Sequence, residues 1–222
     1  GTDLGLEKFC DVVSRQGKLK PDCAVVVATA RAVKSHGGSK DEDLGKENLE
    51  ALEEGLSNLK RHIENVKKFG IWPVVAINKF PDDSDKELNR IREFCRSEGV
   101  LAEVADVVAS GGEGGIKLAE AVLATLQEHP SKFKPLYGPE LPIKDKIDNI
   151  AREIYGAEGA VYVGTSEDDI VFLTENAFDK LPVNMARTHL SFTDDPKVKG
   201  APTGWRLKVR EIKVSAGAGF LI

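Results

Sequence analysis

The chain has 222 residues, of which 41% are hydrophobic and 30% charged, and its formal net charge at pH 7 is −5. This is the composition of an ordinary globular protein, and the length allows one large domain or two small ones. Acidic and basic residues are interspersed, which argues against a nucleic-acid interface, and the longest apolar runs are far below the roughly 20 residues of a membrane span. We therefore expect small-molecule or protein partners, with neither nucleic acid nor a membrane among them.

The cysteines and histidines give no sign of a metal site. Cys10, Cys23 and Cys95 are scattered and form no CxxC pair, and the four histidines show no metal-ligand spacing. Neither a disulfide framework nor a zinc site is predicted. A reducing compartment, the cytoplasm, fits this cysteine usage best.

The first 130 residues alternate predicted strands and helices. Continuous runs rich in β-branched residues predict two strands buried on both faces, over 22–30 and 72–78. A shorter strand is expected within 100–108. Strands of this kind belong to parallel sheets, so the alternation predicts an α/β fold with a doubly wound, mainly parallel sheet and right-handed crossovers.

The connections between these strands are predicted from their periodicity and caps. Residues 31–45, rich in Gly, Ser, Asp and Lys, are expected to form a mobile loop, and leucines at three- and four-residue steps predict a helix over 49–66. Ser84 and Glu87 have the S-x-x-E spacing of a capping box that opens the next helix, in which Cys95 faces the core. His62, within the first of these helices, is expected at the surface.

Four prolines within 129–142 mark a predicted boundary between one domain over 1–130 and a smaller α/β domain over 131–222. In the smaller domain, predicted helices cover 143–155 and 166–178, the second capped by Ser166, and predicted strands cover 160–163, 181–186 and 206–214. The polar stretch 189–204 has no periodic signal, and loops of that length are usually functional or bound to a partner.

Ligands of open parallel sheets bind beyond the carboxyl ends of the strands, so the loops that leave the strands are the candidate sites. The first loop brings together Arg31, Lys34 and His36, which indicates an anion-facing edge or, equally well, a solvated basic loop. Asn78 ends the second predicted strand, and Phe80 lies two residues later, just beyond the strand end. Its ring is placed either to stack on a flat ligand or to pack beneath the next helix.

The third loop is a glycine cluster between a strand and a helix. Bare backbone N–H groups at Gly111, Gly112 and Gly114 can bind an anion, although a tight turn without a ligand explains the same residues. The dinucleotide fingerprint fails, because Lys117 stands at the place of its third glycine. No stretch of the sequence fits GxxxxGK[ST], so we find no phosphate-cradling loop.

Taken in order, several segments resemble the formate–tetrahydrofolate ligase family over essentially the whole chain. They are residues 1–9, 27–38, 58–65, 75–80, 111–115, 150–156, 181–188 and 215–220. Members of this family use ATP to activate formate as formyl phosphate, which N10 of tetrahydrofolate attacks to give 10-formyltetrahydrofolate. The resemblance therefore implies ATP with magnesium, formate and tetrahydrofolate as substrates, with no covalently bound cofactor.

The resemblance also implies that the sheet is part of a P-loop NTPase-like ligase core. In the family the phosphate-binding loop precedes the segment at which this chain starts, so we expect an internal or C-terminal piece, inactive alone, whose partner is the rest of the synthetase. A homo-oligomer is also compatible with the family. The alternative interpretation is a non-catalytic folate-binding or assembly module.

The family pattern assigns roles to some residues. Phe80 corresponds to an aromatic residue that stacks on the pterin, with Pro81 beside it in the folate site. A second stacking residue, a tryptophan, corresponds to Val108, which can line a pterin site but cannot stack. The other residues expected around the cleft are Lys34, His36, Asn78, Gly111, Gly112 and Gly114. Catalytic residues are not assigned, and no metal ligands are expected.

Overall fold

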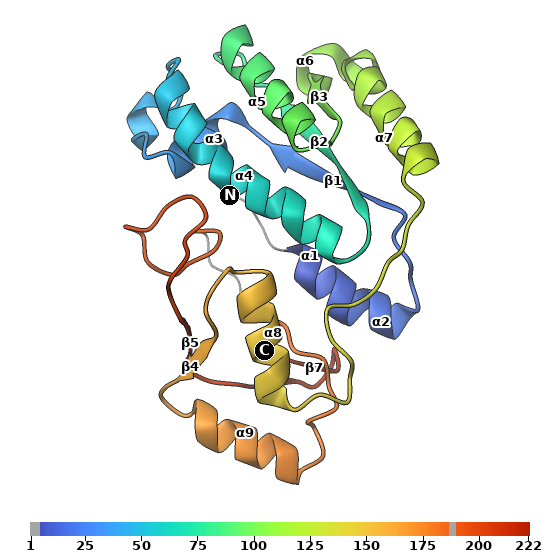
Figure 1. The fold of residues 1–222 in the computed structure, drawn as a ribbon, viewed down its shortest axis with the longest axis vertical. Coiled ribbons are helices and arrows are strands. Elements are labelled where there is room, and N and C mark those ends of the chain that lie inside the picture. The colour runs from blue at the N-terminus through green and yellow to red at the C-terminus, as the bar shows by residue number, and fades with distance from the viewer. Residues whose placement is uncertain (1–4, 187–189) are drawn as a thin grey trace.

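The computed structural model describes residues 5–186 and 190–222 (Figure 1). Its main sheet has three parallel strands in the order β1-β2-β3. They cover Cys23–Ala28 (β1), Trp72–Asn78 (β2) and Ala102–Ala105 (β3). The predicted α/β fold with a parallel sheet is therefore confirmed.

Helices connect these strands and lie on the sheet. They are α3 (Ala30–His36), the 3₁₀ turn η2 (Asp41–Asp43), α4 (Leu49–Lys68), α5 (Asp85–Ser97), α6 (Val107–Ser110), the 3₁₀ turn η3 (Gly111–Gly115) and α7 (Ile116–Glu128). In Figure 1 this part occupies the upper half of the molecule. No helix within the described residues is both long and apolar enough to cross a membrane.

The two faces of the sheet are covered unequally. Val75 and Ile77 of β2 are buried in one apolar cluster with residues of α4 and α5. Because side chains alternate along a strand, the intervening residues face the other side, where α7 packs on the sheet. On that side Val74 is buried, whereas Val25 and Val27 of β1 remain 46% and 64% exposed. The prediction that the first strand is buried on both faces is therefore wrong, because β1 is at the edge of the sheet and one of its faces is left partly uncovered.

The prediction of a mobile loop over 31–45 is wrong, because its first part forms α3. Thr29 caps this helix, since its Oγ1 accepts a hydrogen bond from the Ala32 N–H at 3.0 Å. Glycines let α3 and α4 approach closely: a Cβ at Gly37 would overlap the Ala51 carbonyl oxygen, and one at Gly55 would overlap the Val33 carbonyl oxygen. The tight packing of these two helices is a tertiary feature that local composition does not reveal.

The start of α5 is partly as predicted. Ser84 is its N-cap and accepts a hydrogen bond from the Glu87 N–H at 3.2 Å, and Cys95 is fully buried as expected. The carboxylate of Glu87 instead accepts from the Asn48 N–H at 2.8 Å. The predicted strand within 100–108 is only four residues long, because α6 begins two residues after β3.

The second part of the chain is built from short elements. They are α8 (Ile143–Glu153), β4 (Ala160–Tyr162), α9 (Ser166–Glu175), β5 (Leu207–Val209), β6 (Val214–Ser215) and β7 (Phe220–Leu221). The strand β4 pairs in parallel with β5, and β6 pairs antiparallel with β7. These elements fill the lower half of Figure 1.

Three predictions for this part need correction. The segment 181–186 forms no strand and makes only an isolated bridge between Val183 and Leu221. The single strand predicted over 206–214 is divided between β5 and β6. The N-cap of α9 is Thr165, and Ser166 is its first helical residue, whose hydroxyl donates backwards to Val163.

The N-terminal segment packs with the second part of the chain. It consists of α1 (Gly5–Glu7), the π-helix η1 (Lys8–Val13) and α2 (Ser14–Gly17). Cys10 lies in the same apolar cluster as Phe69, Ile150 and Leu221. This cluster draws residues from both sides of the boundary predicted after residue 130, which stays a prediction.

Candidate functional site

The candidate site lies where β2 and β3 end. These strands are neighbours, with Asn78 in register with Ala105, and the Lys79 N–H donates to the Ala105 carbonyl at 3.1 Å. Both strands run in the same direction, so the segments that hold Phe80 and Val108 leave the sheet at the same edge. Parallel α/β sheets bind their ligands beyond the carboxyl ends of their strands, and this end of the sheet is called the sheet edge below.

Phe80 is held by a tight turn beyond β2. Its N–H donates to Oδ2 of Asp83 at 2.9 Å, and the Asp83 N–H donates back to the Phe80 carbonyl at 3.1 Å. Pro81 is exposed within this turn, whereas Asp83 is buried. The Phe80 side chain is half-buried and belongs to neither apolar cluster of the described residues. The turn therefore leaves part of the ring accessible at the sheet edge.

A guanidinium group covers the ring of Phe80. The Cζ atom of Arg31, in the first turn of α3, lies 4.7 Å from the ring centroid. Its Nη2 donates to Oδ2 of Asp82 at 3.0 Å. The contacts of Asp82 with Arg31 and of Asp83 with the Phe80 backbone became visible only in three dimensions.

Val108 and the glycine cluster follow β3. Val108 is 92% exposed, so nothing in the fold fixes its size. The fold requires a glycine at Gly114, because a Cβ there would overlap the Asp106 carbonyl oxygen. The Asp106 N–H also donates to the Gly114 carbonyl at 3.1 Å. Gly111 has a positive φ of 58°. A Cβ at Gly112 would meet no atom within 4 Å, so the contacts of the described residues do not require a glycine there.

Lys34 is buried and is not an exposed cation at the sheet edge. Its side chain is 1% exposed, and Nζ lies 2.9 Å from Oε1 of Glu87. The same Nζ donates to the Lys46 carbonyl at 2.7 Å. The positive charge is thus compensated inside the fold, which departs from the anion-facing edge considered for the first loop.

His36 lies beside two cavities at the end of β1. One, of about 220 Å³, lies between β1, α3 and α4, and the other, of about 300 Å³, also touches Leu190 and Lys199. Burial, and then the charge of Lys199, lower the pKa of His36 to about 4. The imidazole is therefore neutral at pH 7 and adds no charge to this edge.

The long polar loop packs on α4. Asn58 donates to Oγ of Ser191 at 3.1 Å and to the Gly200 carbonyl at 2.9 Å. The expectation that His62 lies at the surface is wrong: it is 7% exposed, with Nε2 3.1 Å from the same Ser191 Oγ and its ring stacked on Phe192. His189 lies outside the described residues. This side of α4 is thus covered by residues that lie more than 120 positions later in the sequence.

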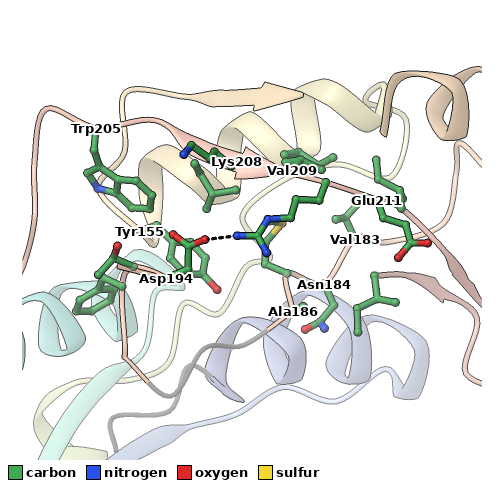
Figure 2. A pocket seen from close by; sticks show the side chains of 17 residues that line it. Tyr155, Val183, Asn184, Ala186, Asp194, Trp205, Lys208, Val209 and Glu211 are labelled. Atoms are coloured by element: carbon green, nitrogen blue, oxygen red, sulfur yellow. Dashed lines mark hydrogen bonds and ion pairs between the residues drawn. The ribbon is translucent and has the colours of Figure 1, made fainter. Parts of the chain in front are cut away.

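A separate cavity of about 310 Å³ lies in the second part of the chain (Figure 2). Its wall is mainly apolar and includes Tyr155, Val183, Trp205, Leu207, Val209 and Ile212. The dashed line in Figure 2 is the ion pair between Arg210 and Asp194, at 2.7 Å. None of the predicted site residues lines this cavity.

The described residues contain no group of three or more His, Cys, Asp or Glu side chains that could hold a metal ion. We therefore assign no residue to magnesium.

Comparison with known protein families agrees with this architecture. The family model described as formate–tetrahydrofolate ligase matches residues 1–222, the whole chain. The match includes the turn of Phe80, the segment of Val108 and the glycine cluster. The chain therefore belongs to the formate–tetrahydrofolate ligase family.

Proposed function

We propose that this chain supplies the folate side of an ATP-dependent formate–tetrahydrofolate ligase. The pterin would lie beyond the carboxyl ends of β2 and β3, stacked on Phe80, with Pro81 and Val108 as neighbouring walls. Asn78 and the exposed glycines Gly111 and Gly112 would border the same cleft. Lys34 and Gly114 would act from behind it, through the packing of α3 and of the loop after β3.

The observation that carries this proposal is the place of Phe80. Its aromatic side chain lies just beyond a strand end, is only half-buried and belongs to neither apolar cluster of the described residues. A ring in such a position can stack on a flat heterocycle, and the ligand of this kind in the family reaction is tetrahydrofolate. The exposed Gly112, which nothing in the fold requires, lies on the neighbouring loop.

The reaction itself is inferred from the family. ATP would phosphorylate formate, and N10 of tetrahydrofolate would attack the formyl carbon and release phosphate. We further infer that the parallel sheet belongs to a core of the P-loop NTPase type. The sequence contains no GxxxxGK[ST] stretch, so the groups that hold the ATP phosphates would come from another segment of the synthetase.

Binding of tetrahydrofolate to the purified chain, measured by calorimetry without oxygen, tests the proposal. Phe80→Ala should weaken binding about tenfold, because it removes the stacking surface. Phe172→Ala is the matched control, since Phe172 is 60% exposed on α9 and lies outside the proposed site. Undetectable binding to the wild-type chain, or equal affinities of wild type and Phe80→Ala, would contradict the folate site.

A second candidate is a non-catalytic folate-binding or assembly module. The missing phosphate-cradling motif and the exposed Val25 and Val27 on β1 favour it for these residues in isolation. Both candidates expect folate binding and no turnover by this chain alone. ATP-, formate- and tetrahydrofolate-dependent formation of 10-formyltetrahydrofolate by the purified chain would exclude the second candidate, and it would also contradict the expectation, common to both, that the chain is inactive alone.

A further inference from the structure

The loop after β1 and the loop after β2 meet through one side chain. The guanidinium of Arg31 lies over one face of the Phe80 ring, with Cζ 4.7 Å from the centroid. It also donates to Asp82, two residues beyond Phe80, at 3.0 Å. Arg31 therefore contacts both the ring and the turn that carries it.

The backbone of Phe80 is fixed independently of this contact. Asp83 accepts from the Phe80 N–H and donates to its carbonyl, and both bonds involve only the main chain of Phe80. They leave the side-chain torsions of Phe80 free. Phe80 belongs to neither apolar cluster of the described residues, and the Arg31 guanidinium lies over its ring.

The guanidinium is suited to this role. It is planar and weakly hydrated, so it stacks on an aromatic face more readily than an ammonium group does. The Arg31 side chain is 35% exposed, and its Nε, which is shielded from solvent, has no hydrogen-bond partner among the described residues. Arg31 is thus in contact with one carboxylate, that of Asp82, and with one ring, that of Phe80.

We propose that Arg31 is a positioning residue for folate binding, acting through Phe80. It would hold the ring in the orientation that a pterin needs on the opposite face, and Asp82 would keep the guanidinium in place. A cation on one face also draws π-electron density towards itself, which reduces the repulsion between the other face and an electron-rich heterocycle. This inference rests on the proposed function, because it assumes that Phe80 stacks on the ligand.

A double-mutant cycle tests the inference, with tetrahydrofolate affinity as the readout. Arg31→Met keeps most of the apolar stem and removes the charge, and it should raise the dissociation constant about three- to tenfold. Arg31→Lys should recover only part of the affinity, since its ammonium does not stack as a plane. In a Phe80→Leu background, Arg31→Met should have no further effect. Thermal unfolding of each variant shows whether the fold is retained.

Arg90→Met is the matched control. Arg90 has the same 35% side-chain exposure and pairs with Glu53 at 2.6 Å, on the α4 and α5 side of the molecule. It should leave the dissociation constant unchanged. This control separates the loss of a half-exposed arginine ion pair from the loss of the contact with Phe80.

The outcomes distinguish the inference from the proposed function. If Phe80→Leu leaves the affinity for tetrahydrofolate unchanged, or the wild-type chain does not bind tetrahydrofolate, the proposed folate site is contradicted. The proposed role of Arg31 is then contradicted as well. If Phe80→Leu weakens binding but Arg31→Met does not, only the role of Arg31 is overturned. Two further results would also overturn it: an equal effect of Arg31→Met in both backgrounds, which means direct ligand contact, or tighter binding by Arg31→Met, which means that Arg31 competes with the ligand.

Discussion

The Nζ atom of Lys34 lies 2.9 Å from Oε1 of Glu87, and the two side chains are 1% and 0% exposed. This buried ion pair ties α3 to α5. Each partner has a second bond, because Lys34 donates to the Lys46 carbonyl and Glu87 accepts from the Asn48 N–H. The pair therefore also fixes the connection that enters α4.

Removing one partner of this pair should destabilise the protein strongly. Lys34→Met leaves the Glu87 carboxylate buried without its counter-ion, and we expect a loss of about 3–5 kcal/mol in the free energy of unfolding. Urea denaturation measures this loss. The exposed pair of Lys60 and Glu98 offers the control, since Lys60→Met should cost less than about 1 kcal/mol. Equal costs for the two variants would contradict a structural role for Lys34.

The crossing of α3 and α4 should not tolerate a methyl group. Gly55→Ala places a Cβ onto the Val33 carbonyl oxygen, so the helices must separate, and we expect a loss of about 1–3 kcal/mol or more. Gly112→Ala meets no atom within 4 Å and should change the free energy of unfolding by less than about 0.5 kcal/mol. The two variants can be compared by thermal unfolding, and a stable Gly55→Ala protein would show that this crossing is looser than described.

The stability of the chain should depend on the protonation of Glu7. Burial raises the pKa of Glu7 from 4.5 to about 8, although the Met185 N–H, donating to its carboxylate, opposes this rise. A carboxyl group with a raised pKa binds its proton more tightly in the folded state. Its contribution is complete below pH 4.5 and is lost as the pH rises towards 8.

Glu7→Gln removes this titration and keeps a hydrogen-bond acceptor for Met185. Relative to wild type, the variant should gain about 3 kcal/mol in the free energy of unfolding at pH 7 and little at pH 4.5. Denaturation across this pH range measures the difference. Glu120→Gln, at an exposed position on α7, should follow the wild-type profile. A constant difference between Glu7→Gln and wild type would contradict the raised pKa.

Val108→Trp should strengthen folate binding. The position is 92% exposed at the edge where β3 ends, so an indole can be added without disturbing the core. A second stacking contact is worth about 0.5–1.5 kcal/mol, which corresponds to a dissociation constant lower by about two- to tenfold. Calorimetry with tetrahydrofolate gives this value, and thermal unfolding should stay unchanged. Weaker binding would mean that the site is shaped around the smaller side chain.

Local patterns predicted the elements whose signal lies within their own sequence. The strands β1 and β2, the amphipathic α4 and the Ser84 cap of α5 follow from side-chain periodicity and a serine hydroxyl. The parallel arrangement follows from their alternation with helices. The position of Phe80 beyond a strand end left both stacking and packing open, and only the family resemblance implied the stacking role, which stays a prediction.

The missed features depend on partners that are distant in the sequence. Helix α3 is short and is stabilised by Glu87 and by the close approach of Gly55, neither of which its own composition reveals. His62 is buried by a loop about 130 residues away. The same holds for Arg31, whose contact with Phe80 joins two loops that nothing in the local sequence connects.

The N-terminal helices and the second part of the chain share one core, and this has a consequence for how the molecule comes apart. Asp11 accepts from the Leu136 N–H, and Gln16 donates to the Gly219 carbonyl, so contacts reach across nearly the full length of the sequence. Proteolysis within the proline-rich stretch 129–142 would thus yield two peptides that remain associated. Contacts between the N-terminal helices and the last residues of the described chain hold the two peptides together. Unfolding of the protein should therefore be a single cooperative transition even after the connecting peptide has been cut.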